Sequence, residues 1–239
     1  MQFIDTHIHL QDVMSSNATN IINTARKRGC AKMFCVSARE SDWVKIETLS
    51  ELFPKTIVPV FGIHPWHIQT CRQGWEDRLQ ILLQSHPQAL IGEIGLDGLK
   101  PDIALQKQVF AVQLKLAQNL HRPAIIHAVK AVPLMDDFWS LLPQKFVFHG
   151  FNGKADFLHK ILKFNGYIGV GFGLLKTPKA KEILSDIPEN KLLLETDAPF
   201  GATYPWDIFD LIEQISVLCH KDKNALAQQI YQNSLEFLR

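Results

Sequence analysis

Eight short apolar segments recur along this 239-residue chain, and most of the intervals between them carry helical spacing. A short apolar run bounded by turn residues is typical of a buried strand. Strands that alternate with helices pair in parallel, because a parallel pair needs a long crossover connection. The pattern therefore predicts an α/β fold, a closed TIM (β/α)₈ barrel that forms a single domain over residues 1–239. The predicted strands cover residues 3–10, 31–38, 57–65, 89–97, 123–128, 145–153, 166–173 and 192–200.

Apolar residues spaced three and four apart predict helices in these intervals. Thr177 followed by Pro178 is typical of a helix N-cap and first turn, so we expect a short helix to begin there. An open doubly wound sheet is the competing fold, but its ligand site would lie at one reversal of strand order, whereas polar residues here recur at the ends of six strands. The other predicted helices cover residues 20–28, 42–53, 75–84, 103–120, 134–142, 207–219 and 222–238.

The first strand carries Asp5, His7 and His9 at every second position of the run FIDTHIHL. Side chains alternate across a strand, so these three polar groups are expected to point the same way. Two imidazoles placed like this can bind one metal ion, and the carboxylate of Asp5 can orient one of them. The alternative is a surface strand with incidental histidines.

Further metal-ligand and proton-transfer residue types stand at the predicted ends of later strands. In a (β/α)₈ barrel the catalytic groups come from the C-terminal strand ends, where the loops gather. Four histidines and two carboxylates on one rim suit two divalent ions, with a carboxylate bridging them and a water between. The six predicted ligands are His7, His9, Glu93, His127, His149 and Asp197, and His64 ends the third strand.

Each of the later residues also has a structural explanation. His127 could be a core histidine, and His149 could pack beneath the glycine-rich turn that follows it. Asp197 could lie in a solvated loop, while Glu93 sits inside the apolar run LIGEIGL, where a carboxylate without a charge partner or ion is costly. His64, held extended by the following proline, could be a ligand, a substrate contact or a turn residue.

The charge and the composition of the chain indicate which partners and which cellular compartment to expect. The formal charge of +1, from 25 basic and 24 acidic residues, argues against a whole-protein electrostatic grip on nucleic acid or on an anionic membrane. Four cysteines without C-x-x-C spacing are expected to be reduced packing residues. No signal peptide precedes the first strand and no apolar run is long enough to span a bilayer, so we expect a soluble cytoplasmic protein.

Six motifs in order resemble those of a known family: D-T-H-x-H-L, G-x-H-P, G-E-I-G-L-D, an I-H that ends the fifth strand, H-x-F-x-G and E-T-D-A-P. Over residues 3–200 the chain resembles the TatD-like metal-dependent hydrolases, TIM barrels of the amidohydrolase superfamily that include DNases. The resemblance implies that His7, His9, Glu93 and Asp197 hold one ion. It also implies that Glu93, His127 and His149 hold the second, with Glu93 as the bridge.

The chain departs from the family pattern at two places. Family members usually read H-x-R-x-A after the fifth strand, but Val129 occupies the arginine position here, so a phosphate contact is missing or shifted to Lys130. The basic segment that usually follows E-T-D-x-P is replaced by GATYPWDIFD, which carries no basic residue. Lys130 and Lys154 are then the remaining candidates for binding a phosphate.

The leading hypothesis is a divalent-metal-dependent phosphodiesterase or deoxyribonuclease that uses a water activated by two Zn, Mn or Mg ions. Asp197 would ligate an ion and accept the water's proton, Glu93 would hold the pair together, and His64 and Lys130 would contact the substrate. A metal-dependent amide or ester hydrolase is the alternative, and a metal-binding scaffold without turnover ranks last. The expected partner is nucleic acid or a short phosphodiester, with no membrane and no obligatory protein partner.

Overall fold

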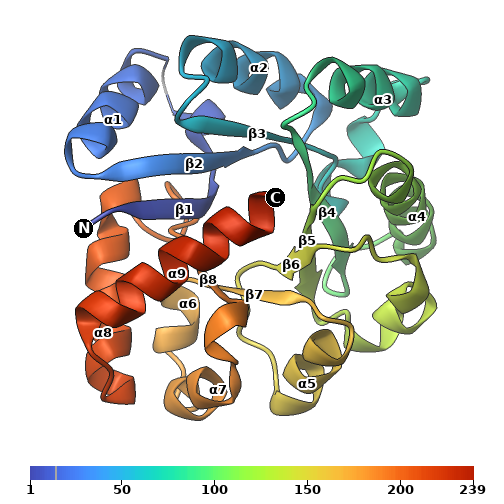
Figure 1. The fold of residues 1–239 in the computed structure, drawn as a ribbon. Coiled ribbons are helices and arrows are strands. Elements are labelled where there is room, and N and C mark those ends of the chain that lie inside the picture. Colours follow the sequence, from blue (N-terminus) through green and yellow to red (C-terminus); the bar gives the residue numbers. More distant parts are fainter. Residues whose placement is uncertain (14) are drawn as a thin grey trace.

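A computed structural model describes residues 1–13 and 15–239 of the chain. In this part of the chain eight parallel strands form one sheet in the order β1 to β8, surrounded by helices (Figure 1). The TIM-barrel prediction is confirmed. The strands are β1 (Phe3–Ile8), β2 (Cys30–Val36), β3 (Ile57–Phe61), β4 (Leu90–Asp97), β5 (Ala124–Val129), β6 (Phe146–Phe148), β7 (Tyr167–Val170) and β8 (Leu192–Leu194).

The first and last strands join to complete the barrel. Ile8 bridges Ala198 in parallel, the His9 amide donates to the Ala198 carbonyl at 2.8 Å, and the Asp197 amide donates to the His7 carbonyl at 2.9 Å. These bonds lie beyond the end of β8, so the segment after that strand is fixed against the histidine-bearing end of β1.

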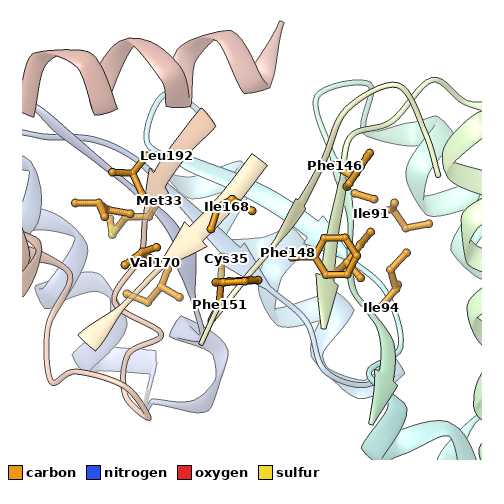
Figure 2. Packing of buried hydrophobic residues seen from close by; sticks show 14 of the residues in the cluster. Met33, Cys35, Ile91, Ile94, Phe146, Phe148, Phe151, Ile168, Val170 and Leu192 are labelled. Carbon is orange, nitrogen blue, oxygen red and sulfur yellow. The ribbon is translucent and has the colours of Figure 1, made fainter. Parts of the chain in front are cut away.

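Two apolar clusters fill the molecule. The smaller contains side chains from all eight strands together with Phe237, and residues of all eight strands can meet only inside the barrel. The larger lies between the sheet and the helices, and Figure 2 shows part of it, including Ile91 and Ile94 of β4 and Phe146 and Phe148 of β6. With both faces of the sheet covered, the strands read as nearly continuous apolar runs.

The helices between the strands are α1 (Ser15–Lys27), α2 (Trp43–Leu52), α3 (Trp75–Ser85), α4 (Ile103–Asn119), α5 (Ala155–Lys163), α6 (Phe172–Leu175) and α7 (Ala180–Asp186), and α8 (Ile208–Cys219) and α9 (Lys223–Leu238) follow β8. Helix α9 lies across one end of the barrel (Figure 1). Its Phe237 ring is 5.2 Å from that of Tyr167 and 6.3 Å from that of Phe34. This helix closes the N-terminal end of the barrel and leaves the C-terminal strand ends as the open mouth.

Two local predictions were wrong. Residues 134–142 form no α-helix but two 3₁₀ turns, Val132–Asp137 and Trp139–Leu141, because the segment is confined between two prolines and buries Met135 and Trp139 against the core. Thr177 does not cap a helix: its hydroxyl donates to the Leu174 carbonyl at 2.8 Å, and α7 begins only at Ala180. The third and sixth to eighth strands are also shorter than predicted, since hydrogen bonding to their neighbours stops earlier than the apolar run.

The four cysteines are unpaired, as expected for reduced packing residues. Across residues 1–13 and 15–239, no helix combines the length and the apolar character that a bilayer span requires.

Candidate metal centre

The six predicted ligands lie together at the barrel mouth, in two overlapping sets. In the first set, His7 Nε2 is 3.0 Å from His9 Nε2 and 3.3 Å from Glu93 Oε2. Asp197 Oδ1 completes it, at 3.3 Å from His9 Nε2 and 3.8 Å from His7 Nε2. Four potential donor atoms, from β1 and the residue after it, from β4 and from the segment after β8, therefore lie close together.

The second set is built around the other oxygen of Glu93. Oε1 of that carboxylate is 2.9 Å from His127 Nδ1 and 2.7 Å from His149 Nε2, and the two imidazole nitrogens are 3.3 Å apart. His127 comes from β5 and His149 directly follows β6. Each oxygen of Glu93 thus faces a different group of histidines.

The donor atoms fit divalent ions. Zinc holds nitrogen and oxygen ligands at about 2.0–2.2 Å, which puts two ligands of one ion about 3.0–3.5 Å apart. Most of the separations within each set lie in or near that interval. His7 Nε2 and His9 Nε2 lie next to each other and next to the oxygens of Glu93 and Asp197. The lone pairs of these nitrogen and oxygen atoms can therefore point at a shared ion. Three overlapping groups each bring three donor atoms within 4.8 Å of one another: His7–Glu93–His149, His7–His9–Asp197 and His64–Glu93–His127.

The far nitrogens of three of the predicted ligands lie near oxygen acceptors. His9 Nδ1 is 2.9 Å from the Val36 carbonyl oxygen. His127 Nε2 is 3.6 Å from Asp97 Oδ2, and His149 Nδ1 is 3.4 Å from Glu195 Oε1. An acceptor behind a metal-ligating imidazole fixes its tautomer and makes the ligating nitrogen more basic. At 3.6 and 3.4 Å neither contact meets hydrogen-bond geometry here, so Asp97 and Glu195 are candidates for this role.

Sequence reasoning missed both of these carboxylates, although Asp97 ends the motif G-E-I-G-L-D and Glu195 opens E-T-D. Asp97 is held in place by the indole of Trp66, which donates to Oδ2 at 2.5 Å, and by the Leu99 amide, which donates to Oδ1 at 2.8 Å. Glu195 accepts from the Gly150 amide at 2.5 Å. Nothing in a single sequence distinguishes such an acid from one exposed at a strand end.

His64 approaches the same cluster from the loop after β3. Its Nδ1 accepts from the Trp66 amide at 3.0 Å, so the neutral ring carries its proton on Nε2, which lies 3.1 Å from Glu93 Oε1. Burial lowers the pKa of His64 to about 4, which favours this neutral form. The protonated Nε2 makes His64 a hydrogen-bond donor at the cluster.

Burial and close charges shift the acidity of the ligands. Burial alone would raise the pKa of Glu93, but the imidazoles of His149, His64 and His7 and the hydrogen bond from His127 hold it well below its usual value. Burial would also raise the pKa of Asp197, and here too the neighbouring histidines lower it. Both carboxylates are therefore ionised at neutral pH, the state that metal binding requires.

The expected role of Asp5 was wrong. Its carboxylate accepts from the Thr196 amide at 3.0 Å, from the Thr196 hydroxyl at 2.5 Å and from the backbone amide of His7 at 3.3 Å. It bonds neither imidazole, because the pairing of β1 with β2 shifts between Asp5 and Ile8 and breaks the strict alternation. Asp5 ties β1 to the segment after β8, and burial raises its pKa to about 7.

Lys130 lies outside the ligand cluster. It lines a cavity of about 810 Å³ that also reaches His127, His149 and Asp197, and two further lysines, Lys154 and Lys179, line the same cavity. Lys179 was not singled out from the sequence. The remaining histidines lie outside the cluster, on helices and loops as expected: His67, His86, His121, His159 and His220.

Comparisons with known proteins point to one family. The sequence model of the TatD related DNase family matches residues 4–239. The chain is 29% identical to an uncharacterised metal-dependent hydrolase of Haemophilus influenzae, over 83% of this chain and 82% of that protein. It is 28% identical to a 3'-5' ssDNA/RNA exonuclease TatD of Edwardsiella piscicida, over 78% of this chain and 75% of that one. The crystal structure of a TatD homologue from Escherichia coli superposes with a TM-score of 0.90 and 25% identity, covering 98% of this chain and 97% of the other.

Proposed function

Because the chain belongs to the TatD-related DNase family, we propose that its barrel mouth holds two divalent metal ions and hydrolyses phosphodiester bonds in nucleic acid. The chain is a metal-dependent hydrolase of that family. The observation that carries the two-ion proposal is the carboxylate of Glu93, whose Oε2 faces His7 while its Oε1 faces His127 and His149.

In this proposal His7, His9, Glu93 and Asp197 hold one ion, and Glu93, His127 and His149 hold the other. Imidazole nitrogens mixed with carboxylate oxygens suit zinc or manganese better than magnesium, which favours sites built from oxygen. Bound ions of this kind lower the pKa of a bound water toward about 7 and neutralise charge on the phosphate. Accepting the water's proton and binding the substrate are the tasks of the protein side chains.

Asp197 is the group best placed to accept a proton from the water. Its side chain is 35% exposed, whereas that of Glu93 is 5% exposed. Oδ1 of Asp197 faces His7 of β1 and His9 just after it, which leaves its second oxygen for the proton. Both oxygens of Glu93 already face imidazoles, so Glu93 acts as the bridge and holds the two ligand sets at a fixed separation.

His64 and Lys130 are proposed to bind the substrate, His64 at the reacting phosphate and Lys130 in the adjoining cavity. The Nε2 proton of His64 points into the cluster, where it can donate to a phosphate oxygen. Lys130 brings a positive charge to the adjoining cavity. The pair would take the place of the arginine that the family usually carries at the position of Val129.

A metal-dependent ester or amide hydrolase is the second candidate, and one observation favours it. Val129 stands 37% exposed on the cavity wall and offers no charge to a phosphate. The same site with an uncharged wall could accept a carbonyl substrate.

One experiment separates the two candidates. Metal-stripped protein would be reloaded with zinc, manganese or magnesium and assayed on a single-stranded DNA oligonucleotide, its RNA counterpart, a duplex and a simple carboxylic ester. We expect metal-dependent cleavage of the single strands that exceeds hydrolysis of the ester. Ester hydrolysis without any cleavage of nucleic acid would overturn the phosphodiesterase proposal, and full activity in metal-free protein would overturn the mechanism.

A further inference from the structure

The cavity beside the ligand cluster is larger than a single phosphate needs. Its volume of about 810 Å³ lies within the range of small-molecule sites. It starts at His127, His149 and Asp197 and continues along the loops after β5 and β6 as far as Lys179. A substrate whose reacting bond lies at the cluster therefore has room to place a further part of itself in this space.

Three lysines from three separate elements line that space. Lys130 follows β5, Lys154 is the residue that precedes α5, and Lys179 precedes α7. None of the three has an ion-pair partner among the described residues, whereas five other lysines pair with carboxylates: Lys107 with Asp137, Lys145 with Glu236, Lys160 with Asp136, Lys221 with Glu189 and Lys223 with Glu213. Unpaired cations gathered around one cavity suit an anionic group of a ligand.

The positions of these lysines are set by the backbone. Lys130 has a φ of 48°, a left-handed conformation that costs free energy for a residue with a side chain, and Gly98 packs against its carbonyl. Lys179 donates to the Gly153 carbonyl at 2.8 Å, which leaves the other protons of its ammonium group free. Helix α5 begins at the same cavity with no side-chain cap, so its first amides add positive potential.

The remaining wall of the cavity is apolar. Val129 and Val132 are 37% and 40% exposed, and Pro133 and Phe151 also line it. Among the described lining residues, Asp156 is the one carboxylate besides Asp197, so the cations outnumber it. The cavity thus combines apolar side chains, which could contact a sugar or base, with three lysines.

From this arrangement we propose that the cavity binds the nucleotide unit next to the scissile bond and that Lys130, Lys154 and Lys179 hold a second phosphate that does not react. This inference rests on the proposed phosphodiesterase function and specifies its substrate class. The preferred substrate carries two phosphates one nucleotide apart, as in an oligonucleotide or a terminally phosphorylated dinucleotide. An isolated diester would leave the lysines unoccupied.

The test compares three dinucleotides with the metal-loaded enzyme: TpT, which has only the internal phosphate, and pTpT and TpTp, which carry a second one at either end. Values of kcat/KM are measured for all three. We expect one of the two phosphorylated forms to exceed TpT by at least tenfold, since a charge-assisted hydrogen bond to a phosphate contributes about that factor. The end that is favoured identifies the direction of the strand across the cavity.

Substitutions of the lysines test whether the preference for a second phosphate depends on them. Lys130→Asn removes the charge with a residue that tolerates the left-handed backbone, and Lys154→Gln and Lys179→Gln remove the other two. Each is expected to lower the ratio between the phosphorylated dinucleotide and TpT about tenfold, and Lys179→Arg is expected to restore it. Lys163→Gln is the matched control, because Lys163 lies at the other end of α5 and does not line the cavity.

Measurements of binding test the second phosphate site independently of the proposed phosphodiesterase activity. The dissociation constants of analogues with an uncleavable methylene phosphonate linkage report the subsite even if no dinucleotide is hydrolysed. Absence of turnover for every substrate would refute the phosphodiesterase proposal alone. Equal affinity for the analogues with and without the second phosphate, or an affinity ratio that survives all three lysine substitutions, would overturn the subsite.

Discussion

Glu93 is the residue on which the arrangement of the site depends most. Both of its oxygens lie within 3.3 Å of ligating imidazoles, and the side chain is almost fully buried. A neutral amide at this position could still fill the space but could not bridge two ions.

We expect Glu93→Gln, and likewise Asp197→Asn, to reduce kcat by more than about 100-fold, since even residues behind the ligands typically cost 10–100-fold. The fold should stay intact, as judged by circular dichroism. Glu51→Gln, which changes an exposed carboxylate on α2, is the control. Activity of Glu93→Gln within tenfold of the unaltered enzyme would contradict the bridging role.

Asp97 is expected to act through His127 without touching the substrate. Its Oδ2 faces His127 Nε2 and is itself held by the indole of Trp66. Asp97→Asn should weaken metal binding about 10–100-fold, and Trp66→Phe should weaken it less, because the carboxylate remains. Competition with a chelator of known affinity measures both. Unchanged metal affinity in Asp97→Asn would show that the carboxylate serves only the fold.

At the scale of elements, the loops that carry the site are tied together by charged side chains. Glu40, just after β2, accepts from the guanidinium of Arg72 at 2.8 Å and from that of Arg78 in α3 at 2.7 Å. Burial would raise the pKa of Glu40, but these arginines lower it to about 2. The pair of contacts fixes the segment before α3 against the loop after β2.

A depressed pKa in the folded state stabilises the fold above the unfolded value of 4.5, and this contribution is lost as pH falls toward about 2. Glu40→Gln should therefore lower the free energy of unfolding by about 1 kcal/mol near neutral pH, a modest value because the arginines are largely exposed. The difference should shrink below about pH 4.5. Urea denaturation at several pH values checks this, and a difference that persists undiminished near pH 2 would contradict it.

At the scale of the whole molecule, the near-neutral charge limits how the protein binds a long polyanion. With about three cavity lysines available for phosphates, the logarithm of affinity for a long single strand should fall with that of salt with a slope of about −2. Titrations across salt concentrations measure the slope. A slope steeper than about −4 would mean that several more phosphates are neutralised at once and that other surfaces contribute.

Metal removal should also affect the stability of the whole fold. The ligands come from β1, β4, β5 and the segments after β6 and β8, so bound ions would link distant parts of the barrel. Ligands that bind only the folded state stabilise it by mass action. Chelation should lower Tm and readdition of zinc or manganese should restore it, as scanning calorimetry would show. Glu93→Gln should respond less to the chelator, and an equal response in both proteins would contradict the proposed ligand set.

The barrel could be predicted from the sequence, and so could the clustering of the six proposed ligands. Apolar runs mark the strands because both faces of a parallel sheet are buried. Among the predicted ligands, His7 stands near the end of one run and Glu93 inside another. The two local errors, at residues 134–142 and at Thr177, fall in connecting segments where tertiary packing outweighs local propensity.

The side chains behind and beside the proposed ligands could not be predicted from the sequence, because they come from distant strands and loops. Asp97 lies beside His127, which is 30 positions away in the sequence, and Glu195 lies beside His149, which is 46 positions away. Asp5 accepts a hydrogen bond from Thr196, which is 191 positions away. Lys179 likewise reaches the cavity of Lys130 from a separate loop. Periodicity reports which face of its own strand a residue occupies, but not which residue of another strand it will meet. Those pairings follow from the register between strands and from the loops that close the barrel.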